Sequence, residues 1–235
     1  MSAIFKRDFR AFFTTPLGYI FCGVFLLFTS LIFTLTCIFS GTSDMSGVFQ
    51  WMLLIMIFLM PVLTMRLLSE EKKLKTDQAL LTAPVGLYSV VFAKFLAAVC
   101  VFLTALVTTL IFPLIIALRG NPQPAIIIGN YIGVFLFAAS FTAVGLFISS
   151  ITENQFVSGV VSMFVFLVIM FVLDYLPEIL PAPLNSLAGN LSFNQRYIRS
   201  FGVGVFNIAD ALFYLSIAAI FVFLTVRVLE KRRYS

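Results

Sequence analysis

The side chains that could carry chemistry are few in this sequence, and they exclude more than they suggest. None of the 235 residues is histidine, which excludes Ser-His nucleophilic sites, histidine-ligated metals and histidine proton relays. The three cysteines lie in apolar runs without a CxxC pair, as packing residues do. The sequence has no GxxxxGK[ST] phosphate loop. We therefore expect no catalytic centre, metal or cofactor in this chain, and any use of ATP and Mg²⁺ belongs to a second polypeptide.

The acidic residues are the remaining candidates. A carboxylate within a membrane is costly and usually functional, as in a proton- or sodium-coupled carrier or an intramembrane aspartyl protease. Each acidic residue here falls at or beyond the end of an apolar run: Asp8, Asp44, Glu70, Glu71, Asp77, Glu153, Asp174, Glu178, Asp210 and Glu230. Their positions weaken both interpretations.

The elements that must position these residues are long apolar runs. The chain is 61% hydrophobic and 11% charged, with a mean hydropathy of +1.10, outside the range of soluble domains. A bilayer core of about 30 Å needs roughly 20 apolar residues in a helix. Six such runs occur, at about 17–39, 48–66, 88–118, 125–151, 156–174 and 211–228. They are continuously apolar, whereas barrel strands alternate, so we predict an all-α, polytopic membrane protein with six transmembrane helices in one domain.

Details within the runs give further expectations. Pro113 should tilt or kink the long third run. Residues 152–155 read as a short turn between the fourth and fifth runs; one bent segment is the alternative, but about 50 apolar residues are too many for one crossing. Gly129 and Gly133 would let helices approach closely, either inside the bundle or along a dimer seam.

The basic residues predict the orientation. With a cytoplasmic N-terminus, only Arg119, Arg196 and Arg199 of the 15 lysines and arginines face outward, which leaves 12 inside (15 − 3). This bias places both termini in the cytoplasm. It also accounts for the net charge of +5, so nucleic acid is not an expected partner.

Two cytoplasmic segments have helical patterns. In residues 1–15, Phe5, Phe9, Phe12 and Phe13 recur at helical spacing around Lys6, Arg7 and Arg10, which predicts an amphipathic interfacial helix; a disordered basic tail is the alternative. In the loop 67–87, Thr76 could cap a short helix that Pro84 ends, with Leu74 and Leu81 on one side; a solvated charged loop explains the spacing equally well.

Several stretches together resemble the ABC-2 type transporter permeases, and especially the subgroup associated with bacterial gliding motility. They are the opening Phe5-Lys6-Arg7-Asp8-Phe9-Arg10, the segment 15–19, the loop 66–85 followed by Lys94-Phe95, the segment 149–155 and the stretch 193–214. The match extends over nearly the whole chain. One departure is Asp77-Gln78, where the family more often has glutamate after the threonine of the loop helix.

The resemblance implies a type V exporter-like subunit in the plasma membrane of a bacterial-type cell. Such a subunit dimerises with an identical or similar permease, docks a separate ABC ATPase that binds ATP and Mg²⁺, contacts membrane lipid and can bind an accessory protein. The outer segment 175–210 would form short helices at the exit side.

The resemblance also assigns roles to residues. The interfacial helix, with Phe5, Lys6, Arg7, Phe9 and Arg10, and the loop helix would transmit ATPase motion to the spans. The expected ATPase-coupling residues are Glu70, Glu71, Thr76, Asp77, Leu80, Leu81, Pro84 and Glu153. Two other functions stay open: a stand-alone secondary carrier, and an ATPase-linked membrane anchor or assembly subunit that moves no substrate.

Overall fold

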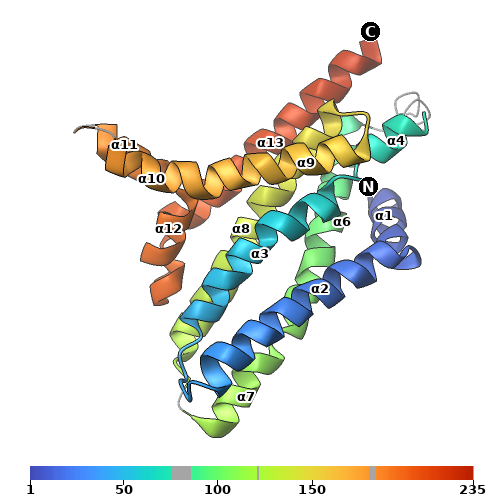
Figure 1. Cartoon of the computed structure of the whole chain (residues 1–235). Helices are drawn as coiled ribbons and strands as arrows, with labels where there is room; N and C mark the ends of the chain where they lie inside the picture. The colour runs from blue at the N-terminus through green and yellow to red at the C-terminus, as the bar shows by residue number, and fades with distance from the viewer. Residues whose placement is uncertain (76–85, 121, 180, 182–183, 235) are drawn as a thin grey trace.

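The computed structural model describes residues 1–75, 86–120, 122–179, 181 and 184–234. All regular structure in these residues is helical (Figure 1). Six helical stretches are long and apolar enough to cross a membrane: Pro16–Ile38, Ser46–Lys73, Leu87–Leu118, Pro124–Ile151, Gln155–Pro177 and Ile208–Arg233. The prediction of an all-α protein with six candidate spans is confirmed.

The N-terminal helix and the first span meet at a sharp turn. Helix α1 (Ser2–Thr14) ends at Thr15, whose extended backbone separates it from α2 (Pro16–Phe33). Pro16 suits this place, because the first helical position needs no N–H donor. Gly18 is required here, since a Cβ atom would lie 2.5 Å from the Phe12 carbonyl oxygen. The span then ends in a π-helical segment, Thr34–Ile38.

The second and third spans are both interrupted. The second consists of α3 (Ser46–Thr64), a turn and the short α4 (Ser69–Lys73). The third consists of α6 (Leu87–Thr108) and α7 (Ile111–Arg119). The break falls four residues before Pro113, which has no N–H to bond the Thr109 carbonyl. That oxygen accepts from the Phe112 amide at 3.0 Å and the Tyr131 hydroxyl at 2.9 Å.

Helix α8 (Pro124–Ile151) is the central span, since 83% of its most apolar stretch is buried against 22–56% for the other five. Its small residues permit this packing. A Cβ atom at Gly133 would lie 2.6 Å from that of Phe201, and one at Gly145 would lie 2.3 Å from the Thr64 hydroxyl oxygen. Gly129 likewise lies against Gly204. These glycines therefore serve contacts within the chain.

The remaining helices first run outward from the bundle, to α11, and then return to it (Figure 1). Helix α9 (Gln155–Leu167) continues through a π-helical segment, Val168–Val172, into α10 (Leu173–Ile179). Two short helices follow, α11 (Leu184–Leu191) and α12 (Phe193–Arg199), then a 3-10 turn, Phe201–Val203, and the last span α13 (Ile208–Tyr234).

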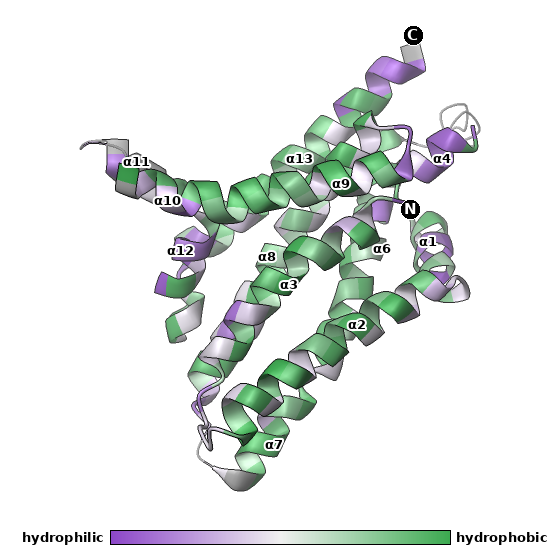
Figure 2. Cartoon of the chain, in the orientation of Figure 1, coloured by the Kyte–Doolittle hydropathy of each residue, from purple (hydrophilic) through white to green (hydrophobic). Residues whose placement is uncertain are grey.

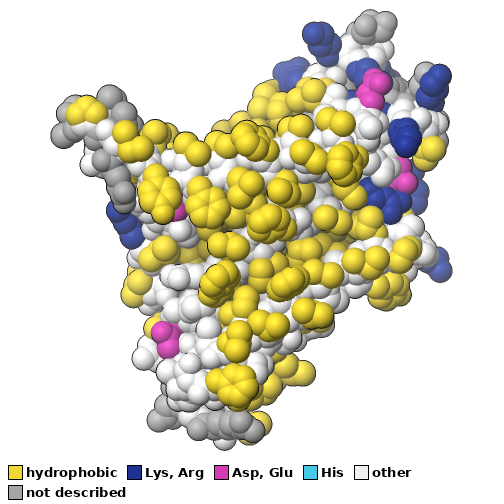
Figure 3. Space-filling view, viewed as in Figure 1, with side chains coloured by type: hydrophobic (Ala, Val, Ile, Leu, Met, Phe, Trp, Pro, Cys, Tyr) yellow, Lys and Arg dark blue, Asp and Glu magenta, His cyan; other side chains and the backbone are white. Residues whose placement is uncertain are grey.

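Polar and apolar residues separate along the bundle. Both termini, α1 and α4 lie at one end, upper right in Figure 1, which we call the terminal end. Hydrophilic residues concentrate there and around α12, while the helices between are hydrophobic (Figure 2). On the face shown in Figure 3, hydrophobic side chains cover α2, α3 and α9, and the lysines and arginines gather mainly at the terminal end. This pattern suits a multi-pass membrane protein.

Candidate functional site

Four charged side chains from three helices meet at the terminal end, and we call them the ion cluster: Arg7 and Asp8 of α1, Glu71 of α4 and Lys94 of α6. The Lys94 ammonium lies 2.7 Å from Glu71 Oε1 and 3.2 Å from Asp8 Oδ2. The Arg7 guanidinium lies 2.8 Å from Asp8 Oδ1 and 3.2 Å from Glu71 Oε1. The cluster thus ties α1 to the second and third spans.

Burial makes these pairings matter. The Lys94 side chain is 4% exposed, Asp8 11% and Glu71 18%, whereas Arg7 is 54% exposed. A buried charge is very costly unless an opposite charge and hydrogen bonds compensate it. Two carboxylates face Lys94, and Arg7 brings the formal charge of the four groups to zero. The hydrogen bond from Arg7 to Asp8 is the main cause that raises the pKa of the arginine, so its charge persists at any physiological pH.

A second ion pair extends the cluster across a cavity. The Arg66 guanidinium binds both carboxylate oxygens of Glu70, at 2.6 and 2.8 Å, in the bidentate geometry that favours arginine. A cavity of about 290 Å³ lies between this pair, the ion cluster and the apolar side of α1. Its rim carries three cations and three carboxylates, so it does not select strongly for an ion of either sign.

Helix α4 is also fixed to the end of α8. The Ser149 hydroxyl oxygen accepts from the backbone amides of Leu68 and Ser69, at 3.1 and 3.0 Å. The Lys72 ammonium donates to the Ser150 carbonyl, where a cation complements the negative end of the helix dipole. Helix α4 therefore contacts the third span through Glu71 and the fourth through Lys72.

Of the expected coupling residues, the structure brings only Glu70 and Glu71 together. Glu153 lies apart, in the turn between α8 and α9, where its 76% exposed carboxylate is 3.4 Å from Arg232. Such an exposed pair adds little stability. The remaining five, Thr76, Asp77, Leu80, Leu81 and Pro84, lie outside the described residues.

Helix α1, for which the sequence predicts an interfacial position, has a partly buried apolar side and an exposed basic side. The Phe5 and Phe9 rings stack with centroids 5.9 Å apart, and both are partly buried. Lys6 and Arg10 are exposed, while Asp8 faces the bundle.

Sequence reasoning did not single out Asp8, Arg66 or Lys94 as site residues. Lys94 gave a signal, because it is the one charged residue in the apolar run 88–118. A charge in such a run usually has a partner and a role.

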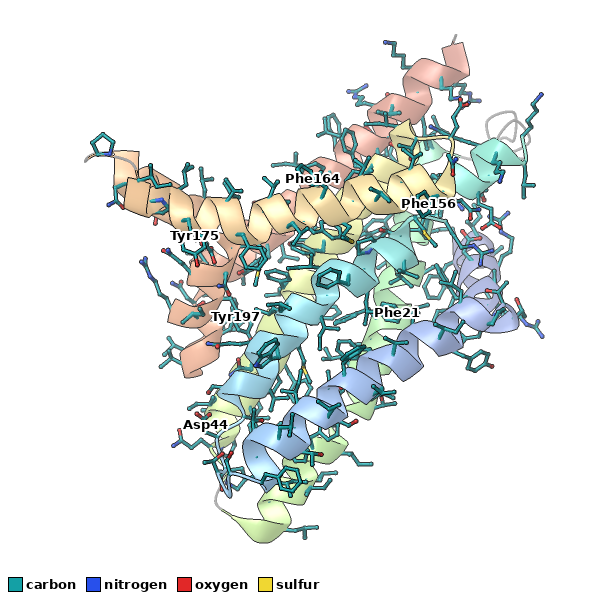
Figure 4. All side chains as sticks on the ribbon, in the orientation of Figure 1. Phe21, Asp44, Phe156, Phe164, Tyr175 and Tyr197 are labelled. Atoms are coloured by element: carbon teal, nitrogen blue, oxygen red, sulfur yellow. The ribbon has the colours of Figure 1, made fainter. Side chains whose placement is uncertain are left out.

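A different polar network lies at the opposite end, where it connects α12 to its neighbouring helices. Asp174 accepts hydrogen bonds from Ser192 and, at 2.8 Å, from the Asn194 amide. Deeper in the bundle, the Tyr197 hydroxyl donates to Asn130 Oδ1 at 2.5 Å (Figure 4). Arg196 lies 2.6 Å from Asp210. These contacts satisfy the polar groups that α12 carries into the bundle.

Within the part of the chain that the structure describes, no three histidine, cysteine or acidic side chains lie close enough to hold a metal ion. At the terminal end, the ion cluster connects α1, α4 and α6.

Comparison with known proteins accounts for this architecture. A search of curated protein sequences found no match to the chain. A protein-family model described as "ABC-2 family transporter protein" matches residues 2–233. Members of this family are the membrane permease components of their transporters and carry no ATPase domain. Six apolar spans and a match over nearly the whole length thus lead to one conclusion: the chain belongs to the ABC-2 family of membrane transporter proteins.

Proposed function

We propose that this permease component receives the motion of its ATPase partner at the terminal end, through α4 and the loop that follows it. The ion cluster then passes that motion to the interfacial helix and the third span. An ABC-2 permease implies an ATPase partner; the docking surface and the route of transmission are our proposal. We further propose the gliding-motility subgroup, a dimer of two permease subunits, and export from the cytoplasm, all by family resemblance.

The distribution of charge supports a cytoplasmic terminal end. Lysines and arginines gather there (Figure 3), in α1, in α4 and near the end of α13, and such an excess marks the cytoplasmic side of a membrane protein. We propose on this basis that both termini lie inside, and by family resemblance that the membrane is the plasma membrane. Because an ATPase works where ATP is, it docks at this end.

The single observation that carries the mechanism is the position of Lys94 between Asp8 and Glu71. A push on α4 moves Glu71. The buried ammonium cannot leave its two carboxylates without a large penalty, so α6 and α1 follow. The contacts of α4 with Ser149 and Ser150 carry the same displacement to α8.

Within this proposal the coupling residues divide into two groups. Leu80 and Leu81 anchor the ATPase, together with Thr76, Asp77, Pro84 and the exposed Glu153. Glu71 is engaged with Lys94 and Arg7, so we assign it to transmission; Glu70, held by Arg66, supports the same helix. Helix α1 is held at the lipid interface by Phe5, Phe9, Lys6 and Arg10.

The test separates docking from transmission. The permease is purified with its ATPase, and the change in hydrolysis rate that the permease causes is measured for Lys94→Met, Lys94→Arg and Leu80→Asp. Lys94→Met should keep the ATPase bound but lose at least half of the permease-dependent change, Lys94→Arg should restore it, and Leu80→Asp should prevent co-purification. Arg227→Gln is the matched control, because it removes an exposed pair with Glu230 at the same end.

Four results would contradict the proposal. If Lys94→Met changes hydrolysis no more than Arg227→Gln does, the ion cluster does not transmit motion. If Leu80→Asp still binds the ATPase, the docking site lies elsewhere. A chain that never co-purifies with an ATPase but carries out gradient-driven flux would be a secondary carrier, and one that binds an ATPase without moving substrate would be an anchor.

A further inference from the structure

An apolar groove of about 630 Å³ runs between the first and second spans. One wall is formed by Phe28, Leu31 and Leu35 of the first span, and the other by Trp51 and Phe58 of α3. These five side chains are 46–53% exposed. Ile55, at 9%, forms the floor. Large hydrophobic side chains therefore line an open groove on the surface of the bundle.

The groove lies in the hydrocarbon region, in the half of the membrane away from the terminal end. It extends from residue 24 to residue 36 of the first span, which runs from Pro16 to Ile38. Twelve steps at about 1.5 Å each make it about 18 Å long, slightly more than the roughly 15 Å of one leaflet. Its length and its position along the span thus correspond to one layer of acyl chains.

The lining selects an apolar occupant. Thr36 is the one hydroxyl-bearing side chain among the described residues that line the groove. Its hydroxyl already donates to the Ile32 carbonyl at 2.8 Å. The one other donor in the lining is the Trp51 indole N–H, and the rest of the described lining is hydrocarbon.

Size distinguishes between the two apolar occupants that a membrane offers. A transmembrane helix is at least about 10 Å wide with its side chains, much wider than a single extended hydrocarbon chain. Close helix contacts in membranes also favour small residues, whereas Phe28, Trp51 and Phe58 form these walls. An extended hydrocarbon chain is narrow and flexible enough to enter, and it gains dispersion contacts on three sides.

We propose that this groove is a binding site for one acyl chain of a bilayer lipid, held in the leaflet away from the terminal end. The inference is independent of the ATPase coupling proposed above. The bound chain fills the space between the first two spans and so maintains their separation.

The chain contains its own probe, because Trp51 is its single tryptophan and lines the groove. The full chain in detergent micelles is titrated with phosphatidylcholine brominated in mid-chain, which quenches tryptophan on contact. The control is the double variant Trp51→Phe, Phe164→Trp. It moves the tryptophan to α9, where Phe164 is 67% exposed outside the groove (Figure 4).

Trp51 fluorescence should fall by at least half and saturate near one lipid per chain, while the control falls in proportion to the lipid:detergent ratio. Ile55→Phe, which fills the floor, should remove the saturable phase. If Trp51 follows the same proportional course as the control, the groove is ordinary lipid-facing surface and the proposal is wrong. The proposal also fails if Trp51 stays unquenched in bilayers made wholly of the brominated lipid, because protein, such as a second copy of the chain, then covers the groove.

Discussion

The Lys94 ammonium and the Glu71 carboxylate lie 2.7 Å apart, although 23 residues separate them along the chain and the lysine side chain is 96% buried. A buried charge is costly unless an opposite charge lies beside it. Asp8, on a third element, shares the same ammonium at 3.2 Å. The junction of three helices therefore depends on a small set of mutually dependent charges.

Removing Lys94 alone should lower stability more than removing both Lys94 and Glu71. Lys94→Met removes one of the two positive charges that Asp8 and Glu71 share with Arg7, which we expect to cost about 3–5 kcal/mol. In Glu71→Gln/Lys94→Met the positive and negative charges of the remaining cluster are again equal in number, and at least about 1 kcal/mol of stability should return. Thermal unfolding of the single and double variants in one detergent gives the coupling energy. Strictly additive effects would show that the two residues do not stabilise each other.

The sequence was sufficient to predict the fold because the membrane leaves few alternatives. An apolar run of about 20 residues can satisfy its backbone in lipid only as a helix, so counting runs gave six spans. The internal breaks were harder to place. Pro113 predicted an irregularity in the third span, and the break lies four residues earlier, at the carbonyl that this proline cannot bond.

The candidate site was less accessible to sequence reasoning because its members are distant along the chain. Lys94 could be recognised as an unusual charge in an apolar run, but its partners come from α1 and α4. The spacing of residues carries no information about which helix ends meet. The same holds at the opposite end, where Tyr197 bonds Asn130 across 67 residues. Which residues form such pairs is decided by how the helices pack against one another.

Tyr131 should stabilise the break in the third span. Its hydroxyl donates to the Thr109 carbonyl, which Pro113 leaves without its usual helical partner. Tyr131→Phe deletes this donor and should lower stability by about 0.5–1.5 kcal/mol. Tyr88→Phe is the control, because Tyr88 lies near the other end of the same span and is 52% exposed. Equal melting temperatures of the two variants would show that the Thr109 carbonyl has no need of the hydroxyl.

Gly133 should not tolerate even a methyl group. A Cβ atom there would lie 2.6 Å from the Phe201 Cβ atom and 2.7 Å from Tyr197 Cε2, so Gly133→Ala must displace the 3-10 turn or α12. We expect a loss of about 1–3 kcal/mol. Gly23→Ala is matched to it, because a Cβ atom at Gly23 meets nothing within 4 Å, and alanine in a helix is favoured over glycine by about 1 kcal/mol.

The two glycine variants are compared by thermal unfolding and by proteolysis of the outer segment. Faster cleavage between α12 and α13 in Gly133→Ala would locate the displacement at the predicted contact. Equal stability of Gly133→Ala and Gly23→Ala would mean that the outer segment does not pack against α8 as described.

Asp44 should make the folding stability of the chain depend on pH. Its Oδ1 atom accepts from the Ser46 amide at 2.9 Å and the Ser46 hydroxyl at 2.6 Å, and the hydroxyl bond is the main cause that lowers the pKa of Asp44 below its usual value. Because the folded pKa lies below the unfolded one, the stabilisation is complete above about pH 4. It is lost as the pH falls through the lowered folded pKa.

Asp44→Ala measures this contribution by comparing its stability with that of the parent chain between pH 7 and pH 2. Near pH 7 the variant should be less stable by about 0.3–1 kcal/mol, the usual effect of an exposed carboxylate at a helix N-terminus, and the difference should shrink as the parent carboxylate becomes protonated. Asp44→Asn keeps an acceptor but no titrating group, so its own stability should lack this acid-dependent component. A gap between Asp44→Ala and the parent that stays constant down to pH 2 would mean that the carboxylate charge does not contribute, and that Ser46 needs only an oxygen.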